Sequence, residues 1–368
     1  MIYFDSAATT LQKPKSVARA VANAISTMTT PGRGDHAPAR RAAEVMLDLR
    51  TTAARMFDAP GAEQVILTTN ATHGLNLAIK SLVKPGDTVV ISGYEHNAVT
   101  RPLHAIGDVK VRIVNGQLFA PDQMAEGFER AVESDVAAVI CTHVSNVFGY
   151  VLPMDDIASI CRKRGVPLVV DASQSAGILP VTVGKWGAAY AAMPGHKGLY
   201  GPQGTGLLLC GRGQVPDPLL HGGTGSLSQL QDMPDFLPDR LEAGTHNVHG
   251  AAGLLQGLRF VSRFLPGQVA EYEKSLMAAL AEGMERAGRY QVYYGGGSVL
   301  SAVPHDIAPE ELADLLAQRG VAVRAGLHCA PLAHITAGTN KTGTVRFSAS
   351  VFNTMGEVQK VLEILRKI

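Results

Sequence analysis

The chain has 368 residues, and its 33 lysines and arginines nearly balance its 32 aspartates and glutamates. This length exceeds the size at which one hydrophobic core usually stops growing, so we expect two domains. The balanced charge, without a basic run among aromatics, argues against nucleic acid as a partner, and the lack of a charged leader or an 18-residue apolar run predicts a cytoplasmic protein with no membrane segment.

Residues 60–210 alternate short β-branched runs with amphipathic stretches. The predicted strands are QVILTT, TVVIS, VKVRIV, VAAVICTHV and PLVVDAS, and the predicted helices are GLNLAIKSL, PDQMAEGFERAVE and MDDIASICRKRG. This alternation is typical of βα units on a buried, mostly parallel sheet, where ligands bind at the carboxyl ends of the strands. Two further apolar runs, AAYAAM and GTGLLLC, flank the turn-rich segment PGHKGLYGPQ, so a lysine in that turn would be firmly held.

The pattern changes after about residue 255. A long helix is predicted in QVAEYEKSLMAALAEGMERAG, followed by two strands, the helix PEELADLLAQRG, the strands VAVRAG and TVRFSAS, and the helix EVQKVLEILRKI. This order indicates a smaller α+β domain. We therefore expect an α/β protein with a large domain at residues 13–255 and a small domain formed by residues 1–12 and 256–368.

Three residues in the predicted sheet region could share one ligand site. Asp171 ends the strand PLVVD, where it could cap a turn or keep a pyridinium nitrogen protonated. Gln174 follows three residues later, and Lys197 lies in the turn between two strands. A lysine that forms a Schiff base must be rigidly placed and partly desolvated, so that its amine is nucleophilic. The combination favours the cofactor site over a simple cap.

Two further segments follow predicted strands at the same edge of the sheet. In LTTNATHGLN, Ala71, Thr72 and Gly74 could offer backbone N–H groups to a phosphate, although Thr72 could equally be an ordinary helix cap. His96, in YEHNAV, could lie flat on the ring of a cofactor. The default interpretation is a solvated loop histidine. The stacking role is favoured for His96 because it is predicted at the same edge of the sheet as Thr72, Asp171 and Lys197.

Eight motifs together resemble one enzyme family: YFDSAATT, TTNATHG, YEHNAV, HVSNVFG, VVDASQSAG, GHKGLYGPQGTG, EAGTHN and RAGLHCAP. Their order and spacing are similar to those of the cysteine desulfurases, in class V of the fold-type I aminotransferases, over essentially the whole chain. The resemblance implies a pyridoxal 5′-phosphate-dependent transferase fold of type I and the conversion of L-cysteine to L-alanine.

The resemblance also implies roles at the cofactor ring. Lys197 would hold pyridoxal 5′-phosphate as a Schiff base, and Asp171 would contact its pyridine nitrogen. Gln174 would contact the phenolic oxygen, and His96 would stack on the ring.

The phosphate would be bound by Thr72, the backbone of Ala71, and His196. Thr245, in LEAGTHN, matches a threonine that completes the phosphate site of the second subunit in this family. The resemblance therefore implies a homodimer.

Asn146 and Arg346 match the pair that holds the substrate carboxylate, a role that suits the planar fork of arginine. Judged alone, Arg346 on an alternating strand would be interpreted as an exposed edge charge. Arg324 is a further candidate to bind the substrate. Arg324 and His328 could also lower the pKa of the thiol of Cys329.

Four cysteines, Cys141, Cys161, Cys210 and Cys329, are widely separated without a CxxC pair, which argues against a disulfide framework and a metal site. A lone cysteine is more often a buried small hydrophobe than a nucleophile. Cys329, however, matches the family's nucleophile, and RAGLHCAP resembles the SUF-like group, which includes selenocysteine lyases. The implied catalytic residues are therefore Lys197, Cys329 and His96.

Several positions depart from the family pattern. Pro194 stands where a phosphate-binding serine is usual, His246 replaces a frequent proline, Leu327 a frequent histidine and His73 a frequent acidic residue. These departures indicate a divergent subfamily.

The implied product is a persulfide on Cys329, from which sulfur passes to an acceptor protein. Selenocysteine is an alternative substrate. The alternative functions are a selenocysteine lyase, another C–S lyase, a class-V aminotransferase or epimerase, and a non-catalytic protein with a degenerate cofactor site. The thiol at Cys329 favours sulfur transfer, because chemistry on carbon alone needs no thiol there.

Overall fold

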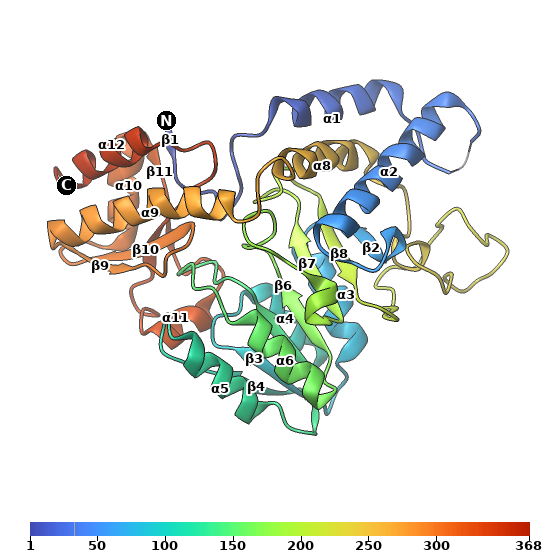
Figure 1. Ribbon diagram of the computed structural model, residues 1–368, viewed down its shortest axis with the longest axis horizontal. Coiled ribbons are helices and arrows are strands. Elements are labelled where there is room, and N and C mark those ends of the chain that lie inside the picture. The colour runs from blue at the N-terminus through green and yellow to red at the C-terminus, as the bar shows by residue number, and fades with distance from the viewer. Residues whose placement is uncertain (33) are drawn as a thin grey trace.

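The computed structural model describes residues 1–32 and 34–368 of the chain. In this part the chain forms a seven-stranded sheet, a four-stranded sheet and a two-stranded sheet, with helices packed around them (Figure 1). Among the described helices, none has an apolar stretch long enough to span a membrane.

The seven-stranded sheet contains every strand predicted between residues 60 and 210. Five neighbouring strands are parallel, and β8 runs antiparallel to both of its neighbours. The mostly parallel sheet predicted from the sequence is therefore confirmed. In spatial order the strands are β2 (Val65–Thr68), β8 (Gly206–Cys210), β7 (Tyr190–Pro194), β6 (Leu168–Asp171), β5 (Val136–Thr142), β3 (Thr88–Ser92) and β4 (Lys110–Val114).

Helices cover both faces of this sheet because successive strand residues point to opposite sides. Val139 belongs to the apolar core on one face and Ile140 to the core on the other. The first core includes residues of α2 (Ala37–Met56), α5 (Pro121–Ala131), α6 (Met154–Arg164) and α8 (Val248–Val261). The second includes residues of α3 (Ala71–Leu82) and α4 (Asn97–Ile106).

Two helices that were not predicted from the sequence precede the sheet. They are α1 (Lys15–Thr27), which packs on α8, and α2. The buried residues of α2 alternate three and four positions apart, which is the spacing of an amphipathic helix. They include Ala39, Ala42, Met46, Leu49 and Ala53.

The four-stranded sheet is antiparallel, in the order β12 (Arg324–Gly326), β13 (Thr344–Ser348), β10 (Val299–Pro304) and β9 (Tyr290–Tyr293). The helices after residue 265 are α9 (Gln268–Ala287), α10 (Pro309–Gln318), α11 (Pro331–Ala337) and α12 (Met355–Leu365). The predicted strand VAVRAG divides into β11 (Val321–Ala322) and β12, which belong to different sheets.

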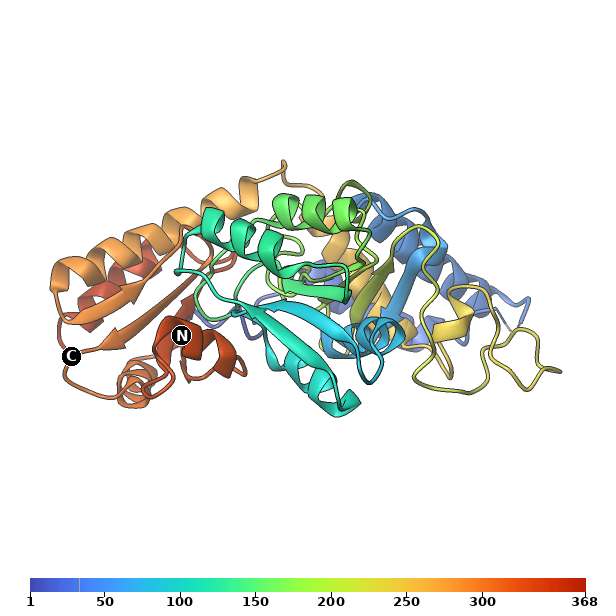
Figure 2. The same cartoon turned by 90° about the horizontal axis from the view of Figure 1, so that it is seen from below.

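The N-terminal residues join this second region. β1 (Ile2–Tyr3) pairs with β11, and Phe4 is buried with Leu276, Leu280 and Phe347 in a third apolar core. Figure 1 shows both termini at the same end of the molecule, and Figure 2 shows this end from below. The segment just after β1 therefore lies beside β13, where Asp5 forms a β-bridge with Ser348.

Candidate active site

A cavity lies where the carboxyl ends of β5, β6 and β7 meet, the edge predicted to bind ligands. The cavity brings together most of the residues predicted to bind cofactor or substrate. Those that line it are Ala71, Thr72, His96, Asn146, Asp171, Gln174, His196 and Lys197.

Lys197 lies in a tightly bonded turn between β7 and β8. The Tyr200 N–H donates to the Lys197 carbonyl at 2.9 Å, and the Gly201 N–H donates to the Gly195 carbonyl at 2.7 Å. Burial lowers the pKa of Lys197 to about 8, and the opposing negative charge of Asp171 limits this shift. About a tenth of this amine is therefore unprotonated and nucleophilic at pH 7, far more than for a lysine with its ordinary pKa.

Asp171 ends β6 and is almost completely buried, with one carboxylate oxygen accepting from the Ser173 N–H at 2.9 Å. The structure adds a second acid beside it, Glu95, which the sequence analysis did not select. Glu95 accepts from the Ser92 hydroxyl and, at 2.8 Å, from the Thr142 N–H. Burial raises the pKa of Glu95 to about 8, and the nearby Asp171 charge contributes to the rise.

The two histidines of the cavity are both neutral. His96 caps α4, and its Nδ1 accepts from the Ala98 N–H at 2.9 Å, which assigns the ring proton to Nε2. Burial lowers the pKa of His96, and it lowers the pKa of His196 to about 4. Nδ1 of His196 lies 3.1 Å from the Thr9 hydroxyl.

The start of α3 supplies the expected anion-binding geometry. Asn70 caps this helix and accepts from the His73 N–H at 2.9 Å. Ala71 and Thr72 line the cavity in the first turn, where helical N–H groups have no intrahelical acceptor. Pro194 lines the same cavity, so the departure from the family's serine falls directly on the site.

Arg346 is 2% exposed, so its interpretation as an edge charge is wrong. The central position of β13, between β10 and β12, buries its side chain. One guanidinium nitrogen donates to the Asn146 carbonyl at 2.8 Å, and another to Asp5 at 3.0 Å. Its Nε has no hydrogen-bond partner among the described residues, and such a buried donor suits an anionic ligand.

Asp5 is a second residue that the sequence analysis did not select. Its carboxylate bridges Arg346 and Arg324, with a distance of 2.9 Å to Nη2 of Arg324. Arg324 is half exposed and lies in β12, five residues before Cys329. The motif YFDSAATT contained Asp5, but its partners lie more than 300 positions away.

Cys329 is the exposed cysteine, whereas Cys141, Cys161 and Cys210 are buried. Burial raises the pKa of Cys161 and of Cys210 to about 12, so these thiols stay protonated. Of the four, Cys329 is therefore the thiol that a substrate and an acceptor could both reach.

The backbone of the Cys329 loop is fastened to the cavity at two points. The Asn97 N–H donates to the Cys329 carbonyl, and the Asn146 side-chain amide donates to the His328 carbonyl, both at 2.8 Å. His328 and Cys329 both have positive φ, at 50° and 56°. Burial lowers the pKa of His328 to about 2, so this neutral imidazole gives the thiol no positive charge.

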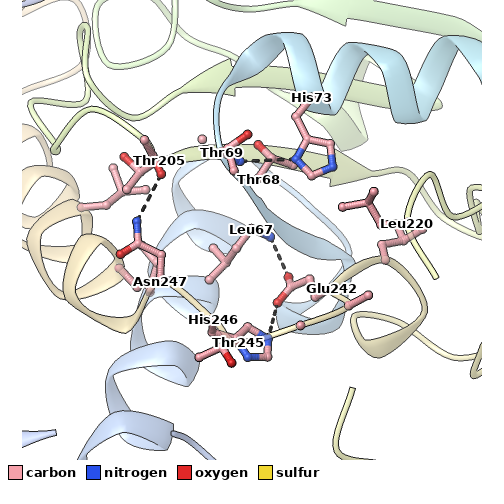
Figure 3. A pocket seen from close by; sticks show the side chains of 18 residues that line it. Leu67, Thr68, Thr69, His73, Thr205, Leu220, Glu242, Thr245, His246 and Asn247 are labelled. Carbon is pink, nitrogen blue, oxygen red and sulfur yellow. Dashed lines mark hydrogen bonds and ion pairs between the residues drawn. The ribbon is translucent and has the colours of Figure 1, made fainter. Parts of the chain in front are cut away.

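Thr245 lines a different pocket, of about 190 Å³ (Figure 3). Within it, Glu242 accepts from Arg50 at 2.6 Å, and its carboxylate lies 3.0 Å from Nε2 of His246. His73 also lines this pocket. Two of the departures from the family pattern, His73 and His246, therefore line the same pocket as Thr245.

Comparison with known proteins agrees with the fold and the motifs. A family model described as aminotransferase class-V matches residues 2–361. A probable cysteine desulfurase of Methanothermobacter thermautotrophicus is 32% identical over 388 residues, covering all of this chain and 94% of that protein. A probable cysteine desulfurase of Pyrococcus abyssi is 29% identical over 385 residues, again covering all of this chain and 94% of that protein.

Solved structures are similar over the same length. The apo cysteine desulfurase of Thermococcus onnurineus NA1 has a TM-score of 0.91 and 29% identity, covering 100% of this chain and 94% of that one. The S-sulfonic acid form of the cysteine desulfurase CsdA from Escherichia coli has a TM-score of 0.88 at 24% identity, covering 99% and 94%, which shows the shared fold. The predicted α/β fold of type I is thus confirmed. The chain belongs to the class-V aminotransferase family and, within it, to the cysteine desulfurases.

Proposed function

We propose that this protein is a pyridoxal 5′-phosphate-dependent cysteine desulfurase that converts L-cysteine to L-alanine and leaves the sulfur as a persulfide on Cys329. The observation that carries the proposal is the pairing of a buried amine with a reachable thiol. Lys197 lies inside the cavity, and the loop of Cys329 is fastened to Asn97 and Asn146 beside it.

The donor set of the cavity fits this cofactor. Lys197 offers an amine with a pKa lowered to about 8, and Asp171 offers a buried carboxylate for a protonated ring nitrogen. His96 would stack on the ring. Gln174, which donates one amide N–H to the Ala7 carbonyl at 3.0 Å, has a second N–H for the phenolic oxygen.

The phosphate would be held by Thr72, the backbone of Ala71, and His196. The helix start supports this role because N–H groups and the helix dipole both favour an anion there. His196 is neutral, with a pKa near 4, and would therefore contribute a hydrogen bond rather than a charge.

Pyridoxal 5′-phosphate, when bound, supplies an electron sink for the electrons released at the substrate Cα. The unprotonated amine of Lys197 would carry the proton at that carbon. Arg346 would bind the substrate carboxylate through its unpartnered Nε, and Asn146 would orient it. These contacts would fix the substrate with its sulfur toward the Cys329 loop.

In the sulfur step, the thiolate of Cys329 attacks the substrate sulfur. An S–S bond forms, the C–S bond breaks, and its electron pair stays on the carbon. That carbon takes up one proton and becomes the methyl group of L-alanine, so carbon is reduced while sulfur is oxidised to the persulfide level. The sulfur then passes to a thiol of an acceptor protein. Arg324, which also binds Asp5, would be a further contact for the substrate.

We further propose a homodimer in which Thr245 completes the phosphate site of the partner subunit. Thr245 lines a pocket other than the Lys197 cavity of its own chain, which suits a role across an interface. The segment before it exposes Leu220, Leu227, Leu230 and Phe236. Such a run of exposed apolar side chains is typical of a surface that a partner covers.

The domain division at residues 13–255, with residues 1–12 joined to 256–368, is also proposed. It is supported by the third apolar core, which packs Phe4 with residues between 276 and 365. The division would place Cys329 on the small domain and Lys197 on the large one. Relative motion of the two domains would then change the distance between thiol and amine.

The proposed function is tested by incubating the protein with L-cysteine and measuring alanine and sulfide together, with selenocysteine in parallel. Equal amounts of alanine and reducible sulfur are expected from L-cysteine. Turnover of selenocysteine alone would favour a selenocysteine lyase. Sulfide formed with pyruvate in place of alanine would favour another C–S lyase. A keto acid or the D-enantiomer, with the C–S bond unbroken, would favour an aminotransferase or an epimerase.

A further inference from the structure

Asp5 forms a charged cluster with Arg346 and Arg324. Its carboxylate is 3.0 Å from Nη2 of Arg346 and 2.9 Å from Nη2 of Arg324. Two guanidinium groups and one carboxylate leave a single net positive charge. One substrate carboxylate therefore neutralises the group, and a second negative charge would face Asp5 without a free cation.

Asp5 is held firmly enough to act in this way. The segment around it is anchored by the β1–β11 pairing and by the Ser348 N–H, which donates to the Phe4 carbonyl at 2.8 Å. Asp5 itself is 7% exposed, so solvent and salt screen its charge little. The three charged groups are brought together by the fold, since they come from the N-terminal segment, β12 and β13.

The location matters because the substrate side chain is expected near Arg324. This step rests on the proposed function, in which the substrate sulfur meets Cys329. Arg324 lies five residues before Cys329, at the start of the segment that leads to it, and binds Asp5 through Nε and Nη2. A side chain that carries its own negative charge would therefore approach a cation that Asp5 has already neutralised.

We propose that Asp5 is a specificity-determining positioning residue: by neutralising Arg324 and orienting Arg346, it restricts the site to amino acids with one carboxylate and excludes acidic amino acids. Asp5 touches neither substrate nor cofactor in this role. It acts through the two arginines, so removing its charge should change which amino acid binds rather than only how well the protein folds.

The test compares L-alanine with L-aspartate as ligands of the cofactor-loaded enzyme. Binding is followed by the change in visible absorbance, so neither ligand needs to react. The wild type should prefer L-alanine. In Asp5→Asn the ratio of the two dissociation constants should move toward L-aspartate by about tenfold or more, because the negative charge that repels the second carboxylate is removed.

A charge-restoring double variant separates charge from structure. Asp5→Asn combined with Arg324→Gln returns the group to one net positive charge, and the ratio should return to within about threefold of the wild type. An unchanged ratio in Asp5→Asn, or a double variant that keeps the shifted ratio, would overturn the inference.

Arg324→Gln alone keeps the test decisive if Asp5→Asn does not fold. This variant lowers the net charge to zero, so L-aspartate should lose more affinity than L-alanine, by about tenfold. An equal loss for both ligands would contradict the inference. Failure of the proposed function remains distinguishable: a protein that releases no alanine from L-cysteine can still show the predicted ligand ratios, because neither probe contains sulfur.

Discussion

The cavity around Lys197 and the loop around Cys329 are built in opposite ways. In the cavity, buried groups on strand ends and helix starts are fixed by short hydrogen bonds, as at Asp171 and His96. In the loop, an exposed thiol is presented on two consecutive residues with positive φ, a conformation that costs about 1–3 kcal/mol for each non-glycine residue. Cofactor chemistry needs a rigid, dry site, whereas a thiol that passes sulfur onward must stay reachable.

The largest effect is expected for Lys197→Ala, which removes the amine from the rigid site. The visible absorbance of the purified protein and all turnover should disappear. Among the described residues that line the cavity, Lys197 is the one lysine. Lys185→Ala, at an exposed lysine paired with Asp155, serves as the matched control and should keep both. A coloured, active Lys197→Ala protein would contradict the cofactor assignment.

Cys329→Ala should separate the two regions. The protein should stay coloured and bind L-cysteine, yet desulfuration should fall by more than about 100-fold, because the nucleophile is gone. Cys161→Ala removes a buried thiol of α6 and should leave the rate nearly unchanged. Full turnover of L-cysteine by Cys329→Ala would show that the loop does not take part in the sulfur step.

Arg346→Gln tests the link between the cavity and the loop. Loss of a charged hydrogen bond to the substrate carboxylate costs roughly 1.5–3 kcal/mol, so KM for L-cysteine should rise by about 10- to 150-fold while the visible spectrum is kept. Arg259→Gln, which removes a surface ion pair with Asp48, should leave KM unaffected. An unaltered KM in Arg346→Gln would mean that the carboxylate binds elsewhere.

Thr245→Ala should weaken cofactor binding by about 2- to 13-fold, the worth of one neutral hydrogen bond, without changing the chemistry at Lys197. Dialysis against buffer without cofactor, followed by the absorbance, measures the loss. The assembly state is measured on the same samples. A monomer that retains its full cofactor content would exclude the proposed role across the interface.

The smallest effect is expected at Pro194, where a hydroxyl can be added to the phosphate side of the cavity. Pro194→Ser should tighten cofactor binding by roughly 2- to 10-fold. Pro194→Ala removes the ring without adding a hydroxyl and is the matched control. Equal affinities for the two variants would mean that no hydroxyl is missing at this position.

The same contrast explains what the sequence could reveal. The positions of Lys197 and Asp171 could be predicted because Asp171 ends an apolar strand and Lys197 lies between two apolar strands. Such strands are visible in the sequence itself. Asp5 was not selected because its meaning depends on arginines 319 and 341 positions away. Glu95 stood in a quoted motif, but only the paired strands β3 and β5 show that its carboxylate is buried.

Helix α2 shows a different kind of omission. Its three-and-four spacing of buried residues was present in the sequence, but the many alanines and arginines of the segment give a weak apolar stripe. The interpretation of Arg346 as an exposed charge at the edge of a sheet was wrong for another reason. Burial of a strand depends on its neighbours in the sheet, which the single strand does not record.

Sulfur transfer to Cys329 is tested most directly by a single-turnover reaction of the wild-type protein with L-cysteine, followed by mass analysis of the peptide that contains Cys329. We expect one added sulfur on Cys329, in an amount equal to the alanine formed, and no added sulfur on the peptides with the three buried cysteines. Alanine formed with an unmodified Cys329 peptide would contradict the claim that the exposed loop, rather than the cofactor cavity, accepts the sulfur.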